Sequence, residues 1–220
     1  MALDRKSEIS ENLAAIKAEI PSEVKLIVVT KTFPVSDVLI LKSLGVNDFG
    51  ENRDQEGSIK AKEVSGTWHF QGQLQSNKLK SICNWADVIH SLDTLRYVDL
   101  INKATSKNLS IFIQVNLAES TQMSEGRAGA TPDQLTEIAS AVLATDNLNL
   151  LGLMAVAPLA TPPEQAFEKL AKIHQRFKND FPAAPYLSAG MSGDYKTAIE
   201  YGATHIRVGS SILGSRPPVR

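Results

Sequence analysis

Short apolar runs rich in β-branched residues alternate with helical patterns along nearly the whole chain, and this alternation limits the possible folds more than any other feature. A run of four or five such residues is typical of a strand buried on both faces of a parallel sheet. The predicted strands cover residues 26–31, a short segment ending at 49–50, 68–72, 88–90, 110–115, 148–154, 186–188 and 205–208. Eight strands alternating with helices in about 200 residues predict an α/β fold, a (β/α)8 barrel of the TIM type.

Helical patterns fill the intervals between these strands. We predict helices at residues 34–44, 53–64, 77–84, 94–107, 131–145, 163–180 and 194–201. Asp93 is the predicted N-cap of the fourth of them. Thr131 and Pro132 are the predicted N-cap and first helical residue of the fifth.

One further helix precedes the first strand. Residues 7–20 carry apolar side chains at helical spacing, so we expect an amphipathic helix there. A doubly wound open sheet would usually show a Gly-x-Gly-x-x-Gly turn after its first strand, where Thr32-Phe33-Pro34 stands instead. We therefore expect a single domain, residues 1–220, in which residues 1–20 form a helix that packs on the barrel.

The composition excludes several classes of protein. Twenty-three basic and 24 acidic residues give a net charge of −1, so no overall field favours nucleic acid or an acidic membrane. The chain has one cysteine, Cys83, which fits a reducing compartment. Neither a signal-peptide pattern nor an apolar run of about 18 residues is present, so we expect a cytoplasmic protein without a membrane span. We also expect a monomer.

Lys31 stands where the first apolar run ends. A lysine at the carboxyl end of a buried strand would lie at the mouth of the barrel, half removed from water. Desolvation there disfavours the ammonium form, and a neutral amine can form a Schiff base with an aldehyde. The alternative is a lysine that simply reaches into solvent at a strand end.

Two loops rich in small residues follow the last two strands. The segment Ser188-Ala-Gly-Met-Ser-Gly-Asp194 and the segment Gly209-Ser-Ser211 occupy the positions where barrels of this kind bind phosphate. The alternative for each loop alone is turn formation. Arg207, on the last strand, could pair with a carboxylate or reach a ligand. Together, these features indicate a ligand with an aldehyde, a phosphate and an aromatic nitrogen, and pyridoxal 5′-phosphate has all three.

The sequence resembles the pyridoxal phosphate homeostasis protein family, single-domain relatives of the alanine racemase barrel. The matching motifs occur in order along nearly the whole chain. They are Val29-Thr-Lys-Thr-Phe-Pro34, Phe49-Gly-Glu-Asn52, Trp68-His-Phe-Gln-Gly72, Leu74-Gln-Ser-Asn-Lys78, His90-Ser-Leu-Asp93, Gln114-Val-Asn116, Gly152-Leu-Met154, Leu187-Ser-Ala-Gly-Met-Ser192 and Arg207-Val-Gly-Ser210.

The resemblance implies a set of cofactor contacts. Lys31 would be the Schiff-base lysine, and Arg207 would lie near the pyridine nitrogen. The implied phosphate contacts are Ser192, Gly209, Ser210 and the Met191 backbone.

Asn52, His69 and Met154 also fall on family motifs, and the resemblance implies that they line the cofactor. Alternatives remain for each: a helix cap for Asn52, a core histidine for His69, and packing for Met154. We assign His90 and Trp68 to packing. No catalytic residue and no metal ligand is predicted.

The sequence departs from the family pattern at several positions. Arg127 stands where a lysine is common, and it cannot form an imine, so its role stays open. The loop at residues 120–126 is a few residues longer than is usual in the family. Ser210 replaces a usual threonine and keeps the hydroxyl. Gln71 and Gln73 are unusual within a matching stretch, and nothing in the sequence accounts for them.

Three functions are compatible with these features. The first is a non-enzymatic protein that holds the cofactor in pyridoxal phosphate (vitamin B6) and amino-acid homeostasis, with transient contacts to apo-enzymes. The second is a weak amino-acid racemase that depends on the same cofactor, and the third is a Schiff-base aldolase-type barrel. Related racemases use a tyrosine from an added β domain. The sequence ends at Arg220, six residues after Gly214, so we do not expect that domain here. Kinship of fold does not transfer a reaction. We therefore favour the first function.

Overall fold

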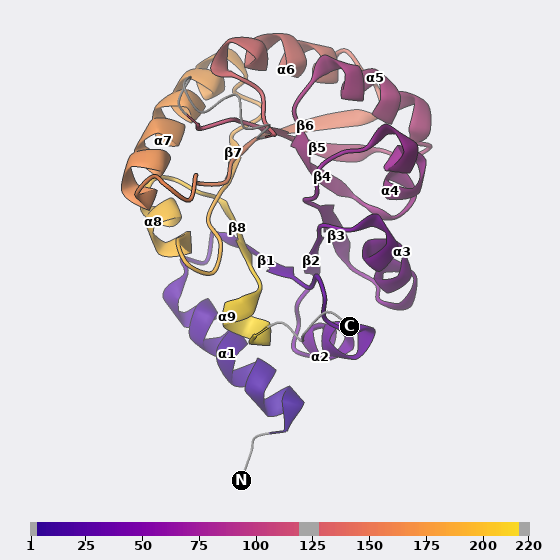
Figure 1. The fold of residues 1–220 in the computed structure, drawn as a ribbon, viewed down its shortest axis with the longest axis vertical. Coiled ribbons are helices and arrows are strands. Elements are labelled where there is room, and N and C mark those ends of the chain that lie inside the picture. The colour runs from indigo at the N-terminus through magenta and orange to yellow at the C-terminus, as the bar shows by residue number, and fades with distance from the viewer. Residues whose placement is uncertain (1–3, 119–127, 216–220) are drawn as a thin grey trace.

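Parallel strands in the computed structural model close into a barrel that helices surround (Figure 1). The structure describes residues 4–118 and 128–215. Eight strands lie within these ranges, in the spatial order of the sequence, and β8 pairs with β1 to close the barrel. Their bounds are β1 Lys25–Val29, β2 Asp48–Glu51, β3 Thr67–Phe70, β4 Val88–Leu92, β5 Leu109–Gln114, β6 Leu148–Met154, β7 Tyr186–Ser188 and β8 His205–Val208. The predicted (β/α)8 barrel is confirmed.

Helices follow the strands around the outside of the barrel (Figure 1). Their bounds are α1 Arg5–Glu19, α2 Val35–Ser43, α3 Asp54–Glu63, η1 Ser76–Lys78, α4 Leu79–Trp85, α5 Leu95–Ala104, η3 Pro132–Gln134, α6 Leu135–Leu143, α7 Pro163–Asp180, α8 Tyr195–Glu200 and α9 Ser210–Leu213. The short helix α9 was not predicted. The predicted cap at Thr131 is confirmed, because its side chain and that of Gln134 form a capping box.

Two local predictions are wrong. The predicted strand through Lys31 ends two residues earlier, at Val29, and Lys31 lies in the following turn. The predicted N-cap Asp93 is not a cap, because α5 begins after Thr94. The Asp93 carboxylate instead accepts a hydrogen bond of 3.3 Å from the backbone N–H of Gly129. In this case a contact distant in sequence replaces the local one.

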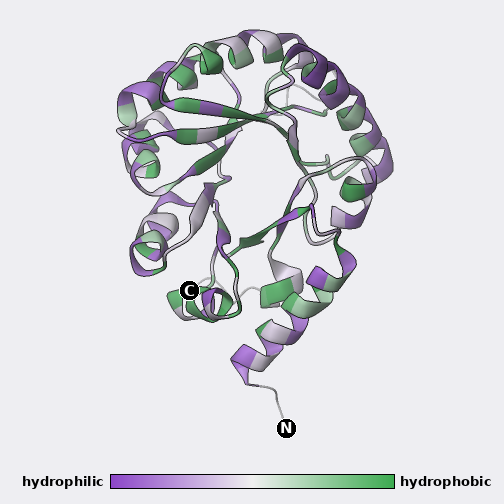
Figure 2. Cartoon of the chain, turned by 180° about the vertical axis from the view of Figure 1, so that it is seen from behind, coloured by the Kyte–Doolittle hydropathy of each residue, from purple (hydrophilic) through white to green (hydrophobic). Residues whose placement is uncertain are grey.

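The main apolar core lies between the strands and the surrounding helices, which turn polar faces to solvent (Figure 2). Along each strand, alternate side chains point into the barrel instead. The interior holds a smaller apolar cluster of Val88, Phe112 and Met154. It also holds buried polar side chains, since His90 on β4 is hydrogen-bonded to Ser188 on β7 across the barrel.

Helix α1 is bound to α2 and α9, the helices that follow the paired strands β1 and β8. Arg5 forms a 2.6 Å ion pair with Asp37 of α2 and donates to the Leu213 carbonyl of α9 at 2.9 Å. Asn12 donates to the Ile212 carbonyl at 3.1 Å. Within the described ranges, no helix has both the length and the apolar character needed to cross a membrane.

Candidate functional site

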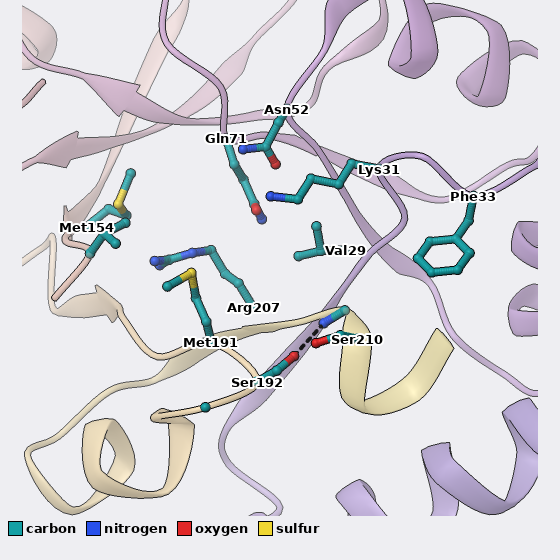
Figure 3. A pocket seen from close by; sticks show the side chains of 13 residues that line it. Val29, Lys31, Phe33, Asn52, Gln71, Met154, Met191, Ser192, Arg207 and Ser210 are labelled. Atoms are coloured by element: carbon teal, nitrogen blue, oxygen red, sulfur yellow. Dashed lines mark hydrogen bonds between the residues drawn. The ribbon is translucent and has the colours of Figure 1, made fainter. Parts of the chain in front are cut away.

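A cavity of about 210 Å³ opens at the carboxyl ends of the strands (Figure 3). The structure brings together at this cavity every predicted site residue except His69. These residues are Lys31, Asn52, Met154, Met191, Ser192, Arg207, Gly209 and Ser210. Lining residues that the sequence did not predict are Val29, Phe33, Gln71, Val156 and Gly193.

Lys31 is half-buried and directs its amine into the cavity, toward Asn52 and Gln71 (Figure 3). The turn that carries it is unusual, because Thr32 has a left-handed backbone with φ of 71°. Few β-branched residues adopt this conformation, which is sterically costly. The backbone N–H of Thr32 donates to the Glu56 carboxylate at 2.6 Å, and this contact with α3 holds the turn in place.

A buried charge cluster lies directly behind this turn. The Lys60 amine is 2.6 Å from Glu51 Oε1, 2.7 Å from the Thr30 carbonyl and 3.5 Å from Glu56 Oε2. Burial raises the pKa of Glu51 although Lys60 opposes the shift. Burial also opposes ionisation of Glu56, but the Thr32 N–H and Lys60 outweigh it, so the pKa of Glu56 is lowered. The cluster therefore presents an ionised acceptor to the turn that bears the lysine.

The loops after β7 and β8 meet at Ser192. Its hydroxyl accepts hydrogen bonds from the backbone N–H groups of Gly209, at 3.2 Å, and Ser211, at 3.4 Å (Figure 3 draws the first). A Cβ atom at Gly209 would lie 2.9 Å from the Val29 carbonyl, so only glycine allows this approach. Ser192, Gly209 and Ser210 thus line one corner of the cavity, and the corner carries two serine hydroxyls. The Met191 N–H is engaged differently, because it donates to Asp194 Oδ1 at 2.6 Å.

Arg207 reaches the cavity from inside the barrel. It donates to the Ser188 hydroxyl at 2.7 Å and to the Ala155 carbonyl at 2.9 Å. Among the described residues, no carboxylate forms an ion pair with it. Burial lowers its pKa to about 10, against an opposing effect of Asp194, so the guanidinium is still charged at neutral pH.

Two polar atoms at the cavity lack partners among the described residues. They are Asn52 Oδ1, an acceptor, and Gln71 Nε2, a donor, and both are buried. Gly50 makes room for the Gln71 amide, since a Cβ there would lie 2.7 Å from Nε2. Unpaired buried polar atoms are costly unless a ligand satisfies them. Together with a lysine, a guanidinium and a corner that carries two serine hydroxyls, they fit a polar ligand bearing an anionic group.

His69, Asn52 and Met154 have different positions relative to the cavity. His69 does not line the cavity: it lies deeper in the barrel, with one ring nitrogen 2.9 Å from His90 and the other 3.1 Å from Asp48. Asn52 does not cap α3, whose N-cap is Arg53. Met154 both lines the cavity and packs in the interior cluster. Residues 120–126 and Arg127 lie outside the described residues. Gln71 could have been found from the sequence, because strand alternation places it on the inward face with His69.

Comparisons with known proteins agree with the fold. The alanine racemase N-terminal domain family matches residues 5–217. A pyridoxal phosphate homeostasis protein of Mycobacterium tuberculosis is 34% identical over 245 residues, covering 97% of this chain and 95% of its own length. The structure of PipY from Synechococcus elongatus with PLP bound superposes with a TM-score of 0.84 at 30% identity, covering 94% of this chain and all of that one. An alanine racemase from Corynebacterium glutamicum, at 13% identity, shares the fold, with a TM-score of 0.77 and coverage of 98% of this chain and 63% of its own.

Proposed function

The chain belongs to the alanine racemase N-terminal domain family and, within it, to the pyridoxal phosphate homeostasis proteins, and from this premise we propose that it binds pyridoxal 5′-phosphate in the cavity at the carboxyl ends of its strands. The relative PipY has PLP bound in its structure, and this chain is similar to it over its full length. The observation that carries the proposal is the convergence of Lys31, Arg207 and the Ser192 corner on one cavity.

Each group of lining residues has a proposed role. Lys31 would hold the aldehyde group of the cofactor through its amine. Ser192, Ser210 and the Gly209 backbone hold the phosphate. Arg207 lies near the ring nitrogen, and Asn52 and Gln71 supply the unpaired acceptor and donor to the polar edge of the ligand. Met154 packs against the ring. When bound, the cofactor supplies an aldehyde that captures amines.

We further propose that the protein holds and releases the cofactor without significant turnover. Racemisation needs an acid/base on each side of the bound amino acid. Of the described residues that line the cavity, only Lys31 and Arg207 are ionisable. A charged guanidinium near the ring nitrogen also disfavours a protonated ring, which is the better electron acceptor. The proposed role is pyridoxal phosphate homeostasis in the cytoplasm, with release to apo-enzymes through transient contacts.

A matched pair of lysine variants tests the binding proposal. We expect wild-type protein mixed with the cofactor to form an adduct that borohydride reduces and that peptide mapping locates at Lys31. Lys31→Ala should abolish it, whereas Lys25→Ala, at the amino-terminal end of β1, should not. An undiminished adduct in Lys31→Ala would overturn the assignment.

Turnover assays test the second part. Wild-type protein should leave L-alanine and D-alanine unchanged over hours, and brisk racemisation would favour the weak racemase instead. A purified protein that shows no visible absorbance with the cofactor would favour an aldolase-type function.

A further inference from the structure

A continuous series of hydrogen bonds runs through the barrel from its amino-terminal end to the cavity. His69 Nε2 lies 3.1 Å from Asp48 Oδ1, and His69 Nδ1 lies 2.9 Å from His90 Nε2. His90 Nδ1 lies 3.0 Å from Ser188 Oγ, which accepts from Arg207 at 2.7 Å. The series joins β2, β3, β4, β7 and β8, and both histidines, the serine and the arginine are buried.

The two ends of this series fix the direction of every bond in it. A guanidinium has only donors, so Arg207 must donate to Ser188. An ionised carboxylate has only acceptors, so His69 must donate from Nε2 to Asp48. A neutral His69 then accepts at Nδ1, which requires His90 to donate from Nε2 and to accept at Nδ1 from the Ser188 hydroxyl. All four bonds therefore point from Arg207 toward Asp48.

The electrostatic surroundings support the protonation states that this direction requires. Burial lowers the pKa of His69, against the opposing effect of Asp48. Burial lowers the pKa of His90 well below its usual value, and His69 and Arg207 add to the shift. Burial opposes ionisation of Asp48, but His69 and Lys25 outweigh it and lower its pKa. Both histidines are thus neutral and Asp48 is charged at neutral pH.

We propose that Asp48 is a distant counter-ion of Arg207 in addition to Asp194, and that His69, His90 and Ser188 are positioning residues that link the two charges and orient the guanidinium at the cavity. A buried guanidinium needs compensation, and in the described part of the chain no carboxylate contacts it, although Asp194 acts on it from a distance. A polarised series of hydrogen bonds supplies it, because each bond strengthens the next. The consequence for cofactor binding rests on the proposed function, whereas the bond direction does not.

The ligand-free protein tests the bond direction. Two-bond ¹⁵N–¹H correlation spectra of histidine-labelled protein report which ring nitrogen carries the proton. His174→Gln and His205→Gln identify the signals of the other two histidines. We expect His69 and His90 to be neutral at pH 7, each with its proton on Nε2. A proton on Nδ1 of either residue would overturn the proposal.

Two carboxylate variants test the role of Asp48. Asp48→Asn removes the charge and lets the side chain donate, so the His90 ring should acquire an Nδ1-protonated population. Asp87→Asn is the control, since Asp87 lies at the same end of the barrel but bonds to Lys107 and the Trp68 N–H. We also expect Asp48→Asn to weaken pyridoxal 5′-phosphate binding, measured by absorbance titration, about threefold or more relative to Asp87→Asn.

The two measurements separate the possible failures. Unchanged His90 tautomers in Asp48→Asn, or equal affinities in the two variants, would show that Asp48 does not act on Arg207. If wild-type protein did not bind the cofactor, the proposed function would fail, and the tautomers would still decide the bond direction.

Discussion

The carboxylate of Glu56 holds the backbone N–H of Thr32 at 2.6 Å, directly after the lysine that faces the cavity. Thr32 is left-handed, so the turn depends on support from α3. A hydrogen bond to a charged acceptor is worth roughly 1.5–3 kcal/mol. We expect Glu56→Ala to lower the free energy of unfolding by about 2 kcal/mol, measured in urea, and to slow adduct formation at Lys31. Glu56→Gln keeps an acceptor and should lose less.

The exposed Glu63 of the same helix provides the control for this prediction. Glu63→Ala should change neither quantity. If Glu56→Ala behaved like Glu63→Ala, the turn would be stable without its carboxylate.

Ser192 and Ser210 should distinguish a phosphorylated ligand from an unphosphorylated one. The double variant Ser192→Ala/Ser210→Ala removes two donors to a charged oxygen, each worth roughly 1.5–3 kcal/mol. We expect it to weaken pyridoxal 5′-phosphate binding at least about tenfold and pyridoxal binding much less, by fluorescence titration. Ser211→Ala is the control, because Ser211 does not line the cavity. Equal losses for both ligands would mean that the serines serve only the loop.

Replacing Gln71 should have opposite effects on stability and on binding. Its Nε2 is buried and has no partner among the described residues, so Gln71→Leu should stabilise the ligand-free protein by about 1 kcal/mol. The same variant removes a donor to the ligand and should weaken binding roughly fivefold. Gln73→Leu, two residues along and exposed, should do neither. Binding equal to wild type in Gln71→Leu would show that the amide does not contact the ligand.

Stability should fall as the pH falls from about 6.5 to about 4. Burial lowers the pKa of both His174 and His205 to about 4, with smaller effects from nearby positive charges. In this range the unfolded chain binds protons that the folded chain does not, so the free energy of unfolding decreases with decreasing pH. The loss is on the order of 3 kcal/mol for each histidine and is complete below the folded pKa.

His174→Leu provides the direct check on this pH dependence. It removes one titrating group and also a buried Nε2 that has no partner among the described residues. Urea unfolding at several pH values should show a shallower slope for the variant. An identical slope would mean that His174 does not titrate in this way.

Local signals were sufficient for most of the fold. The predicted bounds of β6, α7, β7 and β8 agree with the structure, because apolar runs and Pro163 mark these elements strongly. The errors occur where a contact between residues distant in sequence determines the local structure. The left-handed turn at Thr32 depends on Glu56, and Asp93 bonds to Gly129 instead of capping a helix.

The sequence predicted the site residues at the strand ends, but it did not predict how far the cavity extends into the barrel. Strand alternation places His69 and Gln71 on the same inward face, but it does not say which layer forms the floor of a cavity. In the structure the cavity begins at Gln71, one layer above His69, whose ring nitrogens both have partners. The family motifs favoured His69. The unusual Gln71 is explained by the structure, where its Nε2 is buried at the cavity with no partner among the described residues.

The cavity wall contains residues that follow the first and the last strand of the barrel. Lys31 follows β1, the first strand, whereas Arg207 and Gly209 belong to the end of β8, the last, and the two strands are paired. During synthesis on the ribosome the lysine therefore emerges long before the groups that complete its cavity. A ligand that contacts residues after both β1 and β8 binds only the closed barrel. It therefore stabilises completely folded chains relative to nascent or partly unfolded ones. Occupancy of this cavity would thus report that folding has finished.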